Sequence, residues 1–300
     1  MDNDDAIVGR IFSRREALTL AGRGGIGLAL GGALFGGAEA AMQAKAARDV
    51  RLVAAPALTE GPFFVDEGLE RSNLIGDTTR RTVVAGSPLT LAVTIYKLAG
   101  GKYTPLPGVT VDVWHADAAG VYSDEDAPMN HERTGGQNWL RGYQTTDKSG
   151  LVRFETIFPG WYEGRATHIH FKVRQKSGAA TKEFTSQLFF DDALAERVFA
   201  AAPYKAGTGR TLNARDGIFN ERQVGGGVAG DVLTLAPVAA PNGKGHVAEF
   251  AIALTDDSLT SARKRGGPGG PGGPPPGGRP PGGPGGPGER NGNPPNIGSR

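Results

Sequence analysis

The residues between 159 and 171 have the types and spacing best suited to chemistry, because they place two imidazoles, a phenol and a guanidinium within a dozen positions. His168 and His170 lie in an alternating run that is typical of a β-strand, so their side chains point to one face. Two imidazoles on one strand face can bind one metal ion. Pro159-Gly160 marks a turn that is expected to bring Tyr162 back over this strand. The segment therefore predicts part of a metal site, to which other segments would add the remaining ligands.

The chain has no cysteine, and this narrows the choice of metal. Zinc sites usually recruit Cys or a third His, and copper electron-transfer sites need a thiolate. Phenolate is the obvious extra ligand, and a Tyr, whose ordinary pKa is about 10, binds as the anion when a hard, Lewis-acidic cation displaces its proton. This favours Fe(III). Among the six tyrosines, Tyr122 is the best second phenolate, because it follows the strand-like run 109–114 through a short loop.

A series of ordered motifs resembles the intradiol ring-cleavage dioxygenases, the non-haem Fe(III) enzymes that open catechols between the two hydroxyl-bearing carbons. The resemblance extends to both the protocatechuate 3,4-dioxygenase and the catechol 1,2-dioxygenase types. It runs from about Thr59 to about Phe219 and is more specific than a lone His-x-His. Its motifs are Thr59-Glu60-Gly61-Pro62-Phe63-Phe64, Val111-Asp112-Val113-Trp114-His115-Ala116, Gly120-Val121-Tyr122-Ser123, Gly142-Tyr143-Gln144-Thr145-Thr146-Asp147, Phe154-Glu155-Thr156-Ile157-Phe158-Pro159-Gly160-Trp161-Tyr162 and His168-Ile169-His170-Phe171.

The resemblance implies a role for each matching residue. It implies non-haem Fe(III) as the cofactor, and a catechol and O2 as the substrates that give a cis,cis-muconate-type product. The implied iron ligands are Tyr122, Tyr162, His168 and His170, the implied catalytic side chains are Arg165, Tyr162 and Gln187, and the implied substrate-pocket residues are Thr59, Gly61, Pro62 and Phe63. Tyr162 would leave the iron with a catechol proton, and Arg165 would stabilise developing negative charge.

Two departures from the better-known protocatechuate enzymes concern the pocket. Those enzymes resemble this chain but have Tyr where it has Phe63 and Phe189, so two phenolic hydroxyls are missing. The segment between Tyr162 and Arg165 is also short, which predicts a more open mouth. The sequence leaves open whether the substrate is protocatechuate, catechol, a hydroxyquinol or a lignin-derived fragment.

The other histidines have simpler interpretations. His115, at a strand end, is expected to be structural or to support the ligands, with a pocket-lining role as the alternative. His131 lies in a polar, Pro-containing stretch that predicts a solvated loop. His246 is expected to lead into the final strand.

Three other kinds of protein compete with the dioxygenase. A non-catalytic β-sandwich binding module, for instance for carbohydrate, would have no use for two Tyr and two His at one point. A cupin-like oxygenase also uses His-x-His, but it would need a Glu shortly afterwards, and the residues after His170 supply none. A zinc hydrolase would need a carboxylate base, which Glu163 could provide.

The two ends of the chain differ from its middle. Residues 1–40 have Ser13-Arg14-Arg15, a weakly apolar stretch and Ala38-Glu39-Ala40, a pattern that predicts a twin-arginine signal peptide and a periplasmic or extracellular protein. Residues 41–58 are interpreted as a linker and 59–260 as the dioxygenase domain. The Gly/Pro-rich residues 261–300 predict a disordered tail that is free or contacts a cell-wall or extracellular polymer.

The middle of the chain predicts a mostly β fold, an antiparallel β-sandwich with one or two short helices and long active-site loops. A helix is expected at 193–199, capped by Asp191 or Asp192. Strands are expected at 89–96, 109–114, 151–157, 167–174, 184–190 and 247–254. The formal charge of +2 comes without a basic stripe, so no nucleic-acid partner is expected. A homodimer is expected by resemblance, and no membrane span is expected.

Overall fold

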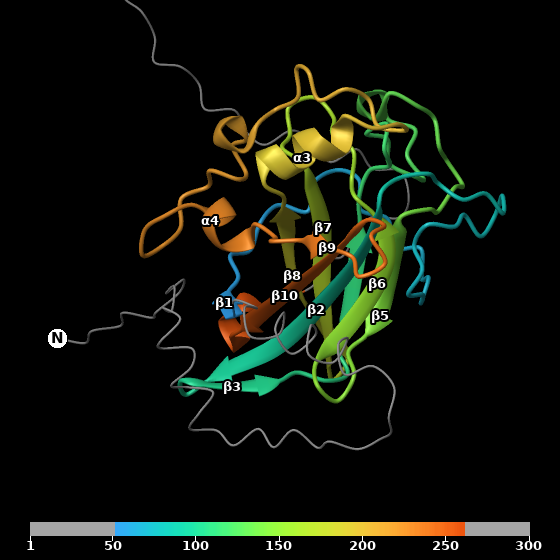
Figure 1. Ribbon diagram of the computed structural model, residues 1–300. Coiled ribbons are helices and arrows are strands. Elements are labelled where there is room, and N and C mark those ends of the chain that lie inside the picture. The colour runs from blue at the N-terminus through green and yellow to red at the C-terminus, as the bar shows by residue number, and fades with distance from the viewer. Residues whose placement is uncertain (1–51, 262–300) are drawn as a thin grey trace, which may run out of the picture. The chain divides into compact units, whose positions relative to one another are not determined.

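Two β-sheets enclose the core in the computed structural model, which describes residues 52–261 (Figure 1). The predicted signal peptide and nearly all of the predicted tail lie outside the described residues. No helix in the part of the chain that is described is long and apolar enough to cross a membrane.

The sheet that carries the histidines has five strands, all antiparallel, in the order β11-β8-β7-β4-β5. Their bounds are β4 Thr110–Trp114, β5 Arg141–Thr145, β7 His168–Ser177, β8 Ala180–Phe189 and β11 Thr260–Ser261. β7 and β8 form a hairpin across Gly178, whose backbone has a φ of 62°. Because a glycine adopts this left-handed conformation without a steric penalty, the chain can turn tightly between the two strands.

The other sheet has six strands, with β1-β10-β2-β3 as its path and with β6 and β9 pairing to β2 and β10. The bounds are β1 Leu52–Ala54, β2 Pro88–Ala99, β3 Lys102–Pro105, β6 Leu151–Ile157, β9 Val238–Ala239 and β10 His246–Leu254. β10 runs parallel to both β1 and β2, so this sheet is mixed. β1 lies within the segment 41–58 that the sequence predicts as a linker.

The predicted β-sandwich is confirmed, and each of the six expected strands coincides with a strand of the structure to within about four residues at either end. β10 departs from the expected antiparallel arrangement, because it pairs in parallel with both β1 and β2. Inward-facing Leu, Val, Ile and Phe side chains from both sheets make up the main core. The period-2 alternation of these strands reflects that burial.

Short helices and long loops complete the fold. The two described α-helices are α3, Asp192–Phe199, and α4, Ala229–Leu233. Asp191 is the N-cap of α3, because its side chain accepts a hydrogen bond of 2.9 Å from the amide of Leu194. Three 3-10 turns occupy Pro128–Asn130, Asn213–Arg215 and Asp256–Ser258. Figure 1 shows α3 and many of the loops gathered at one end of the sheets.

Candidate metal centre

The two histidines lie on the face of β7 that points away from the main core. Ile169, Phe171 and Val173 enter the core, so the alternation along β7 places His168 and His170 on the opposite face. Both imidazoles are nonetheless buried, because loops cover this face.

Strand register places two more side chains beside the histidines. His170 lies opposite Trp114 of β4 on one side and opposite Gln187 of β8 on the other. Opposite residues of paired strands share a face, so Trp114, His170 and Gln187 form one row across the sheet. Gln187, far from the histidines in sequence, is thus a direct neighbour of the site.

Two loops bring the tyrosines to the same place, and two glycines allow these loops to pack backbone against backbone. A Cβ atom on Gly120 would lie 2.1 Å from the carbonyl oxygen of Trp161, and one on Gly160 would lie 2.2 Å from that of Asp117. No real Cβ atom tolerates such distances. Glycine at these two positions therefore permits the close approach of the loop with Tyr122 to the loop with Tyr162.

Four donor atoms converge at this point. The Nε2 atom of His168 lies 3.0 Å from Nε2 of His170, 3.2 Å from the hydroxyl of Tyr162 and 3.5 Å from the hydroxyl of Tyr122. Ligands about 2.0–2.2 Å from one metal ion are about 3.0–3.5 Å apart at ordinary coordination angles. The three separations from Nε2 of His168 fall in that range, as expected for four atoms that bind a single ion.

Hydrogen bonding and stacking orient the two imidazoles. Nδ1 of His168 donates to the carbonyl of Ala166 at 2.6 Å, which leaves Nε2 as a bare acceptor aimed at the cluster. The ring of His170 stacks on Trp114, with centroids 4.8 Å apart and planes inclined by 9°. Its Nδ1 is buried and has no hydrogen-bond partner within the described residues.

Burial keeps the four side chains of the cluster neutral in the absence of a cation. It lowers the pKa of His168 and of His170 well below the ordinary value, with Arg165 adding to the effect. It raises the pKa of Tyr122 well above the usual value and also raises that of Tyr162. Neutral imidazole is the form that binds metals, whereas ionising two buried phenols requires a strongly Lewis-acidic cation. The donor set thus fits Fe(III).

No group of three or more His, Cys, Asp or Glu side chains that could hold a metal is present among residues 52–261. The cluster of two His and two Tyr is a different donor set, in which the tyrosines supply the anionic oxygens.

Arg165 borders the cluster and is fixed from two sides. Its Nε donates to Oδ2 of Asp216 at 2.9 Å, and its Nη2 donates to Oε1 of Gln187 at 2.5 Å. Its Nη1 lies 3.5 Å from Nε2 of His168. The guanidinium therefore presents positive charge directly beside the donor atoms. Asp216 was not found by sequence reasoning, because it follows Arg165 by 51 positions in a stretch that resembles an ordinary loop.

The loop 59–63 covers the cluster. The carbonyl of Thr59 accepts from Nε2 of Gln187 at 2.8 Å. Gly61, with a φ of 71°, lies against the ring of His170, 3.4 Å from the position of an added Cβ to Cε1. Phe63 stacks on Tyr122, with centroids 4.4 Å apart. Pro62 is exposed.

The remaining side chains that the sequence singled out lie outside the cluster. His115 is buried, and its nitrogens lie 2.8 Å from the carbonyl of Ala116 and 2.7 Å from the hydroxyl of Thr156, as suits a structural role. His131 is exposed, and His246 begins β10. Glu163 is exposed in the turn after Tyr162. Phe189 is fully buried, with its ring 6.3 Å from that of His168.

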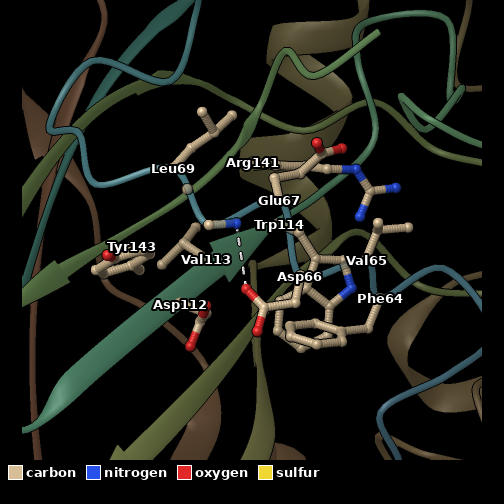
Figure 2. A pocket seen from close by; sticks show the side chains of 12 residues that line it. Phe64, Val65, Asp66, Glu67, Leu69, Asp112, Val113, Trp114, Arg141 and Tyr143 are labelled. Carbon is tan, nitrogen blue, oxygen red and sulfur yellow. Dashed lines mark hydrogen bonds between the residues drawn. The ribbon is translucent and has the colours of Figure 1, made fainter. Parts of the chain in front are cut away.

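A small pocket lies beside Trp114, whose ring also stacks on His170 (Figure 2). It contains about 240 Å³ of empty space, part of it open to solvent, and Phe64, Glu67 and Arg141 help to line it. Nε1 of Trp114 and Oε1 of Glu67 are buried without hydrogen-bond partners in the part of the chain described.

Comparison with known proteins identifies a family and several relatives that this chain resembles. A family model described as Dioxygenase matches residues 59–223, more than half of the chain. The chain is 34% identical over 111 residues to the protocatechuate 3,4-dioxygenase beta chain of Burkholderia cepacia, a match that covers 32% of this chain and 44% of that protein. It is 31% identical over 153 residues to the catechol 1,2-dioxygenase of Acinetobacter baylyi, covering 45% and 46%. The chain thus spans less than half the length of these relatives.

Among solved structures, an intradiol ring-cleavage dioxygenase from Tetranychus urticae superposes with a TM-score of 0.56 at 26% identity. The match covers 67% of this chain and 94% of that one. The family match at residues 59–223 contains every residue of the cluster.

Proposed function

The chain belongs to the dioxygenase family, and from this premise we propose that it is an intradiol ring-cleavage dioxygenase that uses non-haem Fe(III) and O2 to open a catechol-type ring to a cis,cis-muconate-type product. The single observation that carries the proposal is the convergence of two phenol oxygens and a second imidazole nitrogen on Nε2 of His168, at distances of 3.0–3.5 Å.

In this proposal Tyr122, Tyr162, His168 and His170 hold the iron. When bound, Fe(III) supplies the Lewis acidity that ionises the phenols and draws electron density from a catechol. Two phenolates and one hydroxide would balance the charge of the ion, which suits a site covered by apolar rings. Those rings include Phe63 and Trp114, both buried.

The two tyrosines are held differently, and this difference supports a different role for each. The amide of Tyr122 donates to Oδ1 of Asn130 at 2.7 Å, and its carbonyl accepts from Oγ1 of Thr134 at 2.7 Å. With Phe63 stacked on its ring, Tyr122 is fixed. Tyr162 is half-buried in a turn. We therefore assign to Tyr162 the role of the phenolate that moves away and accepts a proton from the catechol.

Arg165 stabilises negative charge as it develops on the substrate oxygens. Its guanidinium is oriented in advance by Asp216 and Gln187, so no reorganisation is needed during the reaction.

Aromatic side chains without hydroxyls surround the candidate site. Phe63 and Phe189 are both buried and supply no polar group to a substrate. A catechol whose ring substituents are apolar suits this surface better than one with a carboxylate, since burying an unpaired charge is costly. On this basis we propose that the substrate is a catechol without a carboxylate on its ring.

The zinc hydrolase alternative has less support. Its expected base, Glu163, is exposed in the turn. Asp216 also brings a carboxylate near the cluster. Its oxygens already accept hydrogen bonds from Arg165 and from backbone amides, including that of Ala166 at 2.7 Å.

Oxygen-isotope labelling tests the proposal. The iron-loaded protein is incubated with catechol under ¹⁸O₂, and the product is identified by mass spectrometry. The proposal predicts a ring-opened dicarboxylate with both labelled atoms and one O2 consumed per catechol. A product that contains no label, or turnover that proceeds without O2, would exclude a dioxygenase and favour hydrolysis.

The roles of the chain ends are proposals of the same kind. We propose export by the twin-arginine route, directed by residues 1–40, to the periplasm or the exterior, and a tail at 261–300 that is free or contacts a cell-wall or extracellular polymer. Cell fractionation with the Arg14→Lys, Arg15→Lys double variant tests the route, because loss of the arginine pair should retain the protein in the cytoplasm. Sedimentation tests the proposed homodimer.

A further inference from the structure

A buried lysine continues the strand face that carries the two histidines. Lys172 follows His168 and His170 at the same alternation on β7, and its side chain is 2% exposed. A lysine is rarely so buried unless its charge is paired. We therefore expect carboxylates close to its ammonium group.

Two carboxylates pair with Lys172, and they come from different parts of the fold. Oε2 of Glu183, on the neighbouring strand β8, lies 3.3 Å from Nζ. Oε2 of Glu60, in the loop 59–63, forms the second ion pair. The ammonium group also lies over the ring of Phe64, 4.1 Å from its centroid. Only Glu183 belongs to the sheet, so the contacts with Glu60 in the loop and with Phe64, the residue directly after it, attach the loop.

The attached loop touches the candidate centre at several points. Gly61 lies against the ring of His170, and the carbonyl of Thr59 accepts from Gln187, which in turn orients Arg165. Phe64 packs edge-on against Trp114, with centroids 4.7 Å apart, and Figure 2 shows these two rings together. The loop position therefore affects both the imidazole ligands and the guanidinium.

We propose that Lys172 is a positioning residue, which acts through its ion pair with Glu60 to hold the loop 59–63 over the metal centre and so to form the substrate side of the site. This proposal rests on the proposed function for its substrate, but the attachment itself does not depend on which reaction occurs. Lys172 links the loop to the strand of the ligands, because it stands only two residues beyond His170. If the loop were displaced from His170 and Gln187, the site would bind a catechol poorly, while the iron ligands would stay in place.

The two partners of Lys172 provide a matched pair of variants. Glu60 and Glu183 are exposed to nearly the same extent, 28% and 25%, and each contributes one carboxylate to the same ammonium. In Glu60→Gln the lysine keeps Glu183, and in Glu183→Gln it keeps Glu60. In both variants Lys172 therefore retains one carboxylate partner, but only Glu60→Gln loosens the loop.

Hydrogen exchange of the segment 57–64, followed by mass spectrometry, measures the attachment without any turnover. We expect Glu60→Gln to exchange about tenfold faster there than wild type, as follows from losing a charged hydrogen bond, whereas Glu183→Gln stays close to wild type. In an anaerobic catechol titration, Glu60→Gln should bind catechol about tenfold more weakly, with unchanged iron content.

Equal loop exchange in wild type and Glu60→Gln would overturn the proposal, as would equally fast loop exchange in the two variants. If the wild-type protein cleaves no catechol, the proposed function fails, yet the exchange comparison still decides whether the ion pair holds the loop. If exchange changes as expected but catechol affinity does not, the loop is held for stability alone and the positioning role is refuted.

Discussion

Asp216 provides the sharpest test of how Arg165 is set beside the donor atoms. The carboxylate is fully buried and accepts four hydrogen bonds. Oδ2 accepts from Arg165 Nε at 2.9 Å and from the Ala166 amide at 2.7 Å. Oδ1 accepts from the amides of Ile218 and Phe219 at 2.7 and 3.1 Å. The variant Asp216→Asn replaces one acceptor oxygen with a donor and removes the charge.

The structure sets the size of the expected loss. If the amide oxygen of the substituted side chain faced Ile218 and Phe219, its NH2 group would meet two other donors, on Arg165 and Ala166. Leaving a partly buried arginine without its carboxylate costs about 3–5 kcal/mol of folding stability. An Arg165 that is held only by Gln187 should also stabilise developing charge poorly, which costs about a hundredfold or more in kcat.

The matched control is Asp77→Asn. Asp77 is another buried carboxylate, and its oxygens accept from the amides of Thr79, Arg80 and Asn138 and from the Thr79 hydroxyl. It contacts no residue of the cluster, so we expect a loss of stability but a kcat close to wild type. Activity would be measured as O2 uptake at saturating catechol, per folded iron-loaded molecule. Wild-type kcat in Asp216→Asn, or an equal loss in Asp77→Asn, would refute the reasoning.

Three further predictions concern the ligands and a buried histidine. Removing the proposed imidazole ligand in His168→Ala should abolish iron retention, measured as iron per chain after dialysis, and full retention would contradict the assignment. Tyr162→Phe should keep some iron but lose part of the visible absorption and slow the removal of the catechol proton, which stopped-flow spectroscopy would detect as slower substrate binding. Burial lowers the pKa of His115 to about 4, from 6.5 in the unfolded chain, so the unfolded state binds more protons between these values. Stability from this residue is complete above pH 6.5 and should fall by about 3 kcal/mol as the pH drops to about 4. Urea unfolding at about pH 7 and about pH 5 should show a smaller fall in His115→Gln than in wild type, and an equal fall would contradict the prediction.

Strong periodicity made most strands predictable. β2, β6 and β10 carry alternating Val, Ile, Leu and Phe, so the sequence predicts β6 and β10 to within one residue and β2 to within three residues at either end. β5 was not predicted, because Arg141–Thr145 has a buried arginine, a glycine and polar residues where an apolar face would be expected. β3 is largely exposed and likewise has no apolar pattern.

Long-range pairing limits what a sequence shows of the site. The spacing of His168 and His170 is local, so their shared face could be predicted from period 2 alone. The parallel pairing of β10 and the contact between Asp216 and Arg165 join distant segments, and no local pattern encodes them. One signal was available for Lys172: a charged residue at a buried position of the alternation needs an acidic partner, although its identity depends on the fold.

The visible spectrum of the iron-loaded protein, before and after anaerobic addition of catechol, tests the central claim most directly. Two tyrosinate ligands predict a broad phenolate-to-Fe(III) charge-transfer band that moves to longer wavelength when catechol binds the metal. A colourless protein with measured iron occupancy would contradict the assignment of Tyr122 and Tyr162 as ligands. A colourless protein that contains zinc would contradict the dioxygenase itself.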